Sequence, residues 1–312
     1  MPETKEKWIE ITILTPPELT EALSNFLEET GTGGVFQDVA VQDSFNGPTV
    51  STQETIKSYL PWSRTIKKQT DRITAYIDSL SSLFPKLEKP RLSTKTIVDP
   101  DWAEQWKKYF KPLRVSENIV IKPTWERYSP AGSDIVVDID PGMAFGTGQH
   151  SSTRMCIVAI EDLLLKDGSR EERTVLDVGT GTGILAICSA KLGVRAVKGI
   201  DIDPKAVEIA GRNIVINGVE DRVEIINRDI TLCRGSFDLI VANLISGVLI
   251  QLHAHLISLT KPGGYIIASG ITEHDAKDVE KIFCNGDVTL HNTQIEKEWV
   301  CYTFKKDAAH HS

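Results

Sequence analysis

The segment VLDVGTGTGIL, residues 175–185, constrains the fold more than any other stretch of the chain. A short apolar run typical of a buried strand ends in Gly179, Gly181 and Gly183, and a helical pattern follows. Glycine has no Cβ, so the backbone can approach a ligand closely, and the free N–H groups at a helix N-terminus are donors. The order of strand, glycine turn and helix therefore predicts a ligand site in an α/β fold.

The spacing of these glycines limits the class of ligand that the turn can bind. The dinucleotide-binding fingerprint needs a glycine at its sixth position, where this chain has Ile184. Asp201 stands at the end of the next predicted strand, where an acid can accept hydrogen bonds from two ribose hydroxyls. We expect the neighbouring Asp203 to cap the helix that begins at Pro204. A nucleoside without a diphosphate is therefore the favoured ligand.

From about residue 136 the chain alternates between strand and helix patterns, which predicts a doubly wound, mostly parallel sheet of α/β class. The final two strands follow one another without a helix between them, which indicates an antiparallel edge. We expect strands at 135–140, 174–179, 196–202, 223–229, 237–244, 265–271, 288–296 and 299–306, and helices at 151–165, 184–192, 204–217, 247–259 and 274–283.

The first hundred residues have a different pattern. Strands are expected at 8–14, 33–41 and 91–98, and helices from Pro16 to Gly31 and at 64–84, an order that resembles a small ferredoxin-like α+β domain with one strand not located. Next, Trp102, Trp106 and Phe110 recur at four-residue spacing, which predicts a linker helix. We therefore predict an α+β domain at 1–95, a linker helix at 96–115 and an α/β domain at 116–312.

Composition excludes several classes of protein. The 312 residues carry a net charge of -8, and no run of about 18 apolar residues occurs, so we expect neither membrane insertion nor direct nucleic-acid binding. The five cysteines form no C-x-x-C pair, which argues against a disulfide framework or a zinc site and fits the cytoplasm. No metal site is predicted, and the sequence is silent on oligomeric state.

Residues 177–183, with an acid before x-G-x-G-x-G, resemble the first motif of the seven-stranded methyltransferases that use S-adenosylmethionine. Three further segments resemble the ribosomal protein L-11 methyltransferases: DPGMAFGTGQHSST at 140–153, VANLISG at 241–247, and W-x-x-x-W-K at 102–107. The FGTG-x-H portion is specific, because a plain methyltransferase domain lacks it. The chain departs from the family at Leu244–Ser246, usually I-L-A, and at Thr180 and Thr182, more often Cys or Ser.

The resemblance implies a small-molecule cofactor, S-adenosylmethionine, and a set of site residues. The cofactor contacts would include Thr153, Gly179, Gly181, Asp201 and Asn243. A loop over the nucleoside and the methyl group would contain Phe145, Gly146, Thr147, Gly148 and His150. For His150 a capping role at the helix N-terminus is equally open, and Asp229 is expected either to bond adenine or to lie in a solvated turn.

Asn243 is the predicted catalytic residue, because it ends the strand at 237–243 at the carboxyl edge of the sheet. Its amide oxygen can accept a hydrogen bond from an amine and so aim the nitrogen lone pair at the reacting methyl group. A turn-forming asparagine at a strand end is the alternative.

The function implied is methylation of lysine ε-amines and of the N-terminal α-amine of ribosomal protein L-11, which the leading domain would hold. Three alternatives stay open. A methyltransferase of the same fold could act on nucleic-acid bases or on release-factor glutamine, but those sites read N-P-P-aromatic and this chain supplies no ring after Asn243. A nicotinamide-dependent oxidoreductase is disfavoured by Ile184. A non-catalytic nucleoside-binding module is the third.

Overall fold

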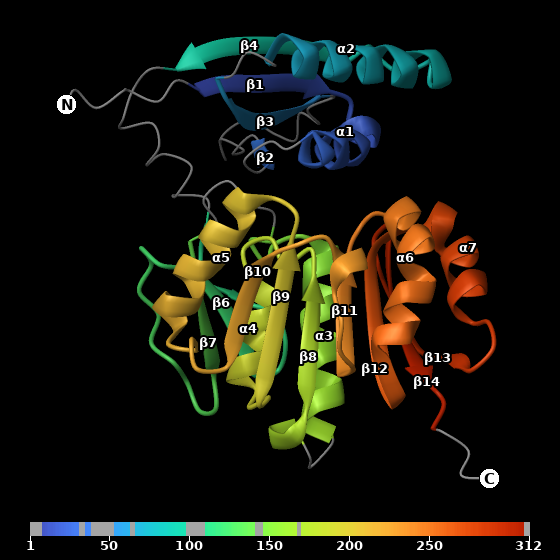
Figure 1. Cartoon of the computed structure of the whole chain (residues 1–312). Coiled ribbons are helices and arrows are strands. Elements are labelled where there is room, and N and C mark those ends of the chain that lie inside the picture. Colours follow the sequence, from blue (N-terminus) through green and yellow to red (C-terminus); the bar gives the residue numbers. More distant parts are fainter. Residues whose placement is uncertain are drawn as a thin grey trace. The chain divides into compact units, whose positions relative to one another are not determined.

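The computed structural model of the chain describes residues 8–30, 35–38, 53–62, 66–97, 110–140, 146–166 and 170–308 (Figure 1). The chain divides into two compact units, residues 1–110 and 111–312. Most of the predicted linker helix, including Trp102 and Trp106, lies outside the described residues. Within the described residues, no helix is both long and apolar enough to span a membrane.

The first unit is a ferredoxin-like α+β fold, as predicted. Its elements are β1 (Trp8–Thr15), α1 (Pro17–Glu29), β2 (Val35–Asp38), β3 (Glu54–Pro61), α2 (Ile66–Leu83) and β4 (Arg91–Ile97). The sheet order is β2-β3-β1-β4, and each neighbouring pair is antiparallel. The strand that the sequence did not locate is β3. Its buried face places Ser58 between Ile56 and Leu60, and this polar residue interrupts the apolar alternation that marks a strand.

The core of this unit lies between one face of its sheet and its two helices. Alternate residues of β1 point into it, because successive side chains of a strand face opposite sides. The buried core residues are Ile9, Ile11, Ile13, Leu19, Leu23, Leu27, Ile56, Leu60, Ile73, Ile77 and Leu80.

The second unit is built on a seven-stranded sheet of order β10-β9-β8-β11-β12-β14-β13. The strands are β8 (Thr174–Val178), β9 (Ala196–Asp201), β10 (Val223–Asn227), β11 (Phe237–Asn243), β12 (Thr260–Thr272), β13 (Val288–Glu296) and β14 (Trp299–Lys306). All pairs among β8–β12 are parallel, and β14 runs antiparallel to both of its neighbours. The antiparallel edge is therefore confirmed.

Helices cover both faces of this sheet, so the doubly wound prediction is also confirmed (Figure 1). One face packs against α3 (Ser151–Lys166), α4 (Ile184–Lys191) and α5 (Pro204–Asn217), and the other against α6 (Ser246–Leu259) and α7 (Glu273–Phe283). Two short 3-10 helices are η3 (Arg170–Glu172) and η4 (Ile230–Leu232). The strand order reverses direction at β8, and in such sheets ligands bind at the carboxyl ends of the strands beside that point.

The strand predicted at 135–140 does not join the large sheet, so that expectation was wrong. It is β7 (Ile135–Ile139), which pairs in parallel with β6 (Ile119–Pro123), and β6 pairs with the two-residue β5 (Leu113–Arg114). The sequence analysis missed β5 and β6. Val137 and Ile139 of β7 still pack into the core on the α3–α5 face, together with Ile119 and Ile121 of β6.

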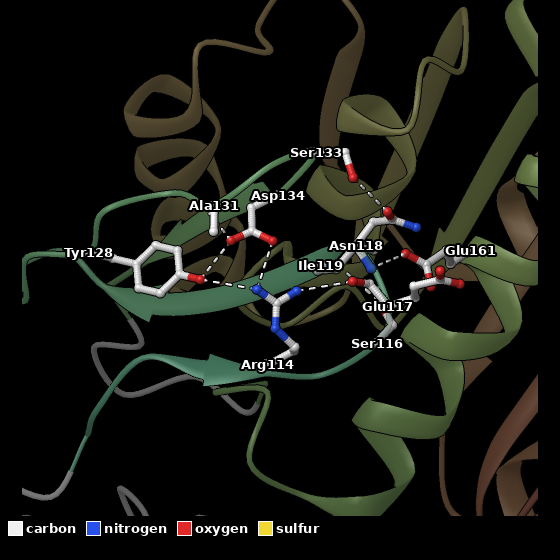
Figure 2. A network of polar contacts seen from close by, with 10 residues as sticks. All are labelled: Arg114, Ser116, Glu117, Asn118, Ile119, Tyr128, Ala131, Ser133, Asp134 and Glu161. Atoms are coloured by element: carbon white, nitrogen blue, oxygen red, sulfur yellow. Dashed lines mark hydrogen bonds and ion pairs between the residues drawn. The ribbon is translucent and has the colours of Figure 1, made fainter.

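A polar cluster braces this small sheet, as Figure 2 shows. The Asp134 carboxylate accepts hydrogen bonds from Arg114 Nη2 at 2.7 Å, Tyr128 Oη at 2.7 Å and the Ala131 amide at 2.9 Å. We call these four residues the Asp134 network. Nearby, the Glu161 side chain of α3 accepts a hydrogen bond from the backbone N–H of Asn118 at 3.1 Å. This bond joins the small sheet to α3.

Candidate active site

The three glycines of the 175–185 segment all adopt left-handed backbone conformations, with φ of 69° at Gly179, 55° at Gly181 and 83° at Gly183. A Cβ added at Gly179 would lie 2.6 Å from Leu244 Cδ2, and one at Gly183 would lie 3.2 Å from Ala210 Cβ. Gly179 is exposed where β8 ends, whereas Gly183 is buried under α5. The turn therefore needs glycine for its conformation and for close packing, and it presents bare backbone at the carboxyl edge of the sheet.

Asp177 lies beneath this turn and is fully buried. Its Oδ2 accepts hydrogen bonds from Thr180 Oγ1 at 2.6 Å and from the Ala186 amide at 3.2 Å, so it joins the turn to the first turn of α4. Within the described residues, Oδ1 has no hydrogen-bond partner. Burial raises the pKa of this carboxyl to about 7, and the two hydrogen bonds oppose the rise. The carboxyl is therefore balanced between its charged and neutral forms near neutral pH.

The glycine turn and the end of β9 are joined through Asp201. Its Oδ2 accepts a hydrogen bond from the Gly181 amide at 3.0 Å, and its Oδ1 accepts one from the Asp203 amide at 2.9 Å. Asp203 in turn accepts from the Lys205 amide at 2.9 Å and caps α5, as predicted. Asp201 is half-buried, so its carboxylate remains open on one side.

Asn243 ends β11, and its side chain meets α3. Asn243 Nδ2 donates a hydrogen bond to Thr153 Oγ1 at 3.2 Å, and Thr153 is buried in the first turn of that helix. On the other side, a Cβ added at Gly270 would lie 3.1 Å from Asn243 Oδ1 and 2.6 Å from the Leu244 carbonyl oxygen. The missing side chain at Gly270 therefore leaves room for the Asn243–Leu244 corner, while Thr153 orients the amide.

Residues 146–148 lie against the glycine turn, although they are far from it in sequence. Thr182 Oγ1 donates a hydrogen bond to the Gly146 carbonyl oxygen at 2.6 Å. A Cβ at Gly148 would lie 3.2 Å from Ile184 Cδ1 and equally close to Ile121. Thr147 accepts a hydrogen bond from the Gln149 amide at 3.3 Å through its hydroxyl. The structure therefore brings the two glycine-rich segments together, whereas the predicted loop residue Phe145 lies outside the described residues.

His150 occupies the capping position that the sequence left open. Its Nδ1 accepts a hydrogen bond from the Ser152 amide at 3.3 Å and lies 2.6 Å from Ser152 Oγ. Its ring meets the Trp299 ring edge-on, with 4.7 Å between centroids. Loss of hydration on burial lowers the pKa of this imidazole to about 4. His150 is therefore neutral at physiological pH, with Nδ1 directed at the start of α3.

Arg154 ties the same segment to the β13–β14 hairpin. Its guanidinium donates to the Gln149 carbonyl oxygen, to Ser151 Oγ and to the Glu296 carboxylate, and the pKa of Glu296 is lowered by this contact despite partial burial. Arg154 thus links the 146–150 segment to the end of β13, the edge strand of the large sheet.

Two asparagines of α5 bind the backbone at and just after the end of β7, and sequence analysis missed both; of the two, only Asn213 also bonds the glycine turn, through the Thr182 carbonyl oxygen. Asn213 and Asn217 are four residues apart and so share one helix face. Asn217 exchanges two hydrogen bonds with the backbone of Asp138, and Asn213 does the same with Asp140. The signal that could have found them is a repeated amide on a helix that is otherwise apolar on its buried side. The exposed Asp229, by contrast, caps η4 through the Thr231 amide at 2.8 Å.

These residues could hold a nucleoside. Gly179 and Gly181 present backbone without side chains at the end of β8. On one side of β8, Asp201 presents a carboxylate at the end of β9, and on the other side Asn243 presents an amide at the end of β11. The described residues contain no group of three or more His, Cys, Asp or Glu side chains that could hold a metal ion.

Three features place the chain in the class of S-adenosylmethionine-dependent methyltransferases: the seven-stranded sheet, the glycine turn after β8, and Asp201 at the end of β9. Within that class, residues 7–307 match the model of the family described as Ribosomal protein L11 methyltransferase (PrmA). The chain belongs to this family. The family and the methyl donor expected from the sequence are thereby confirmed.

Individual relatives agree with this assignment. The ribosomal protein L11 methyltransferase of Geotalea uraniireducens is 36% identical over 313 residues, covering 97% of this chain and 99% of the relative. That of Geobacter sulfurreducens is 37% identical and covers 97% and 99%. The crystal structure of ribosomal protein L11 methylase from Lactobacillus delbrueckii subsp. bulgaricus matches with a TM-score of 0.57 and 30% identity, over 64% of this chain and 100% of that one.

Proposed function

We propose that this enzyme methylates lysine ε-amines and the N-terminal α-amine of ribosomal protein L11, in the cytoplasm where ribosomal proteins are made. The observation that carries the proposal is the contact between two strand ends. Leu244, the residue after Asn243, lies so close to Gly179 that a Cβ there would be 2.6 Å from its side chain. An amine held at Asn243 is therefore beside the turn that would bind the donor.

Gly179, Gly181 and Asp201 would hold the adenosine portion of S-adenosylmethionine, by backbone contact and by hydrogen bonds to the ribose hydroxyls. When bound, the donor supplies a methyl group on a positively charged sulfur. Asp201 suits this role, because its carboxylate is already fixed by two backbone amides and still has an open side.

Asn243 would accept a hydrogen bond from the acceptor amine through Oδ1 and direct the nitrogen lone pair. Thr153 supports this orientation, because it accepts the hydrogen bond from Nδ2 and leaves Oδ1 facing the Gly270 side. Deprotonating a lysine of pKa about 10.4 costs about 4.6 kcal/mol at pH 7. His150 is neutral, but its Nδ1 is used at the start of α3. Positioning of the amine is therefore the main contribution of these residues.

The first unit, predicted at 1–95, would hold the protein substrate. In β1 the residues Ile9, Ile11 and Ile13 face the helices, so Glu10 and Thr12 lie on the opposite sheet face, where Glu10 accepts a hydrogen bond from Tyr59 at 3.2 Å. The sheet face away from the helices, which carries Glu10, Thr12 and Tyr59, would be the face that meets the protein substrate. Removal of residues 1–95 should leave donor binding intact and abolish methylation of L11.

The experiment is incubation of the full chain with S-adenosylmethionine and ribosomal protein L11, followed by mass spectrometry of the peptides. Methyl masses on lysines and on the N-terminal residue are expected. Methylation of nucleic acid or of release-factor glutamine in place of L11 would select the alternative of the same fold. Calorimetric binding without transfer to any of these would select a non-catalytic module.

Asp201→Ala tests the donor site, with Asp203→Ala as its matched control. Loss of the Asp201 carboxylate should weaken donor binding by about 1–3 kcal/mol, the range for a charge-assisted hydrogen bond, in calorimetric titration. Asp203→Ala removes the same charge two residues away and should cost about 1 kcal/mol of folding stability as a lost cap, with donor affinity unchanged. Equal donor affinity in the two variants would remove Asp201 from the site.

A further inference from the structure

Thr182 and Asn213 are two fully buried polar residues, and the Asn213 side chain meets the backbone of Thr182 at the glycine turn. Thr182 stands between Gly181 and Gly183, and its hydroxyl donates to the Gly146 carbonyl oxygen at 2.6 Å. Its own carbonyl oxygen accepts a hydrogen bond from Asn213 Nδ2 at 2.9 Å. One residue of the turn is thus bonded on its side chain to one segment and on its backbone to another.

The Asn213 amide makes three hydrogen bonds to backbone groups. Besides Thr182, it accepts from the Asp140 amide at 2.9 Å through Oδ1 and donates to the Asp140 carbonyl oxygen at 3.1 Å. Asp140 follows β7, and Gly146 begins the segment that leads to α3. Two chain positions on the small-sheet side are therefore bonded to the same turn residue, Thr182, one directly and one through Asn213.

A glycine turn needs such support, because glycine loses more conformational freedom on ordering than any other residue. Backbone bonds anchor the start of the turn: the amides of Gly179 and Thr180 both donate to the Ile200 carbonyl oxygen, at 2.9 and 3.0 Å. The later part, from Gly181 to Gly183, has a backbone bond from the Gly183 amide to the Thr180 carbonyl oxygen at 2.8 Å, and is also held by Asp201 on one side and by Thr182 and Asn213 on the other.

We propose that Thr182 and Asn213 are positioning residues that hold the two glycine-rich segments, Gly146–Gly148 and Gly179–Gly183, in the conformation that binds the methyl donor. The inference rests on the proposed function of the same site. Neither side chain touches the donor in this scheme. Each acts by removing the entropy cost of ordering glycine backbone at the moment of binding, which is how preorganisation raises affinity.

The chain offers matched variants for both residues. Thr182→Ser keeps the hydroxyl, and Thr182→Val keeps the shape without it. Asn213→Leu removes all three hydrogen bonds. Asn217→Leu is its control, because Asn217 lies one turn further along α5 and bonds Asp138 and the Asn213 carbonyl oxygen but no residue of the glycine turn. A purely structural role predicts that Asn213→Leu and Asn217→Leu behave alike.

The test measures three quantities on the full chain: the dissociation constant for S-adenosylmethionine by calorimetry, the melting temperature, and kcat against KM for the donor. Thr182→Val should raise the dissociation constant and KM about tenfold with kcat nearly unchanged, because a buried carbonyl loses its donor. Thr182→Ser should stay within about threefold of the parent, since it retains that bond. Asn217→Leu should lower the melting temperature but leave donor affinity as it was.

Two results would overturn the inference: parental donor affinity in Thr182→Val, or an equal loss of affinity in Asn217→Leu and Asn213→Leu. Where Asn213→Leu does not fold, the Thr182 pair decides alone, because its members differ by one hydroxyl. Failure of the proposed function is a separate outcome. The parent chain would then transfer no methyl group to L11 whatever its donor affinity, whereas failure of the inference leaves the donor affinity of the variants equal to that of the parent.

Discussion

Two carboxyl groups in the second unit, those of Asp134 and Asp177, both accept hydrogen bonds, yet their pKa values are shifted in opposite directions. Asp134, on the small sheet, accepts from three donors, one of them the guanidinium of Arg114, and its pKa is lowered to about 2 (Figure 2). Asp177, under the glycine turn, accepts from two neutral donors, and burial raises its pKa to about 7. Hydrogen bonds from the Ala131 amide, Tyr128 and Arg114 favour the charged form of Asp134, whereas burial favours the neutral form of Asp177.

The difference shows what each network contributes. The Asp134 network includes the half-exposed guanidinium of Arg114 at the edge of a three-stranded sheet, so solvent can replace that cation, although the Asp134 side chain itself is only 5% exposed. The residues around Asp177 order a turn of glycines that has little rigidity of its own, and no solvent can take their place. Changes under the turn should therefore have larger effects than changes in the Asp134 network.

Asp177→Asn should have the largest effect, and it should depend on pH. Between pH 4 and 7 the folded state holds a proton on Asp177 that the unfolded state has released, so this group lowers the free energy of unfolding as pH rises through about 7. A shift from 3.8 to about 7 corresponds to about 4 kcal/mol. Urea unfolding from pH 4 to 8 should show that the free energy of unfolding of the variant rises with pH relative to that of the parent, because the contribution of Asp177 is gone. An unchanged pH profile would contradict the buried neutral carboxyl.

His150→Asn should have the next largest effect, with the opposite sign. Here the unfolded state binds the proton between about pH 4 and 6.5, so the group lowers the free energy of unfolding as pH falls, by about 3 kcal/mol in all. The two groups nearly cancel in the parent chain over this range. Asparagine retains the cap. In this variant the free energy of unfolding should therefore fall steadily as pH rises from 4 to 7, measured by the same titration. A flat profile would count against the assignment.

Gly183→Ala tests the steric side of the turn. The left-handed φ of 83° and the Ala210 Cβ at 3.2 Å together should lower the free energy of unfolding by about 2–3 kcal/mol. The control is Gly218→Ala, where φ is 62° and a Cβ would meet nothing within 4 Å, so about 1 kcal/mol is expected from the backbone alone. Both free energies of unfolding are measured by urea unfolding. Equal losses in the two variants would show that α5 shifts away from the added methyl group at no cost, so that the contact with Ala210 contributes nothing.

Asp134→Asn should have the smallest effect. The lowered pKa means that the carboxylate stabilises the fold above about pH 4 and that this contribution is lost as pH falls through about 2. The variant should therefore differ from the parent at neutral pH and approach it in acid, with a difference that shrinks in high salt. Thermal unfolding at two salt concentrations measures it. A loss as large as that in Gly183→Ala would reverse the order of the two networks.

Sequence reasoning reached much of the fold because the signals were local. Pro204 at the start of α5 with Asp203 as its cap, and the apolar runs of β8 and β11, follow from backbone preference and from neighbours a few residues away. The glycine turn belongs to the same group, since its spacing and left-handed conformations are properties of the segment itself. Asp201 and Asn243 could be placed at one edge because parallel strands end together.

The chain by itself therefore determined the strand–turn–helix order, the strand ends at which we propose the site, and the family motif. The tertiary structure decided whatever depends on partners distant in sequence. It paired β7 with β6 outside the large sheet, gave Asn213 its bonds to Asp140 and Thr182, and by burial raised the pKa of Asp177 and lowered that of His150. The physical reason is that desolvation and side-chain hydrogen bonding depend on what surrounds a residue in space, which a one-dimensional pattern does not specify.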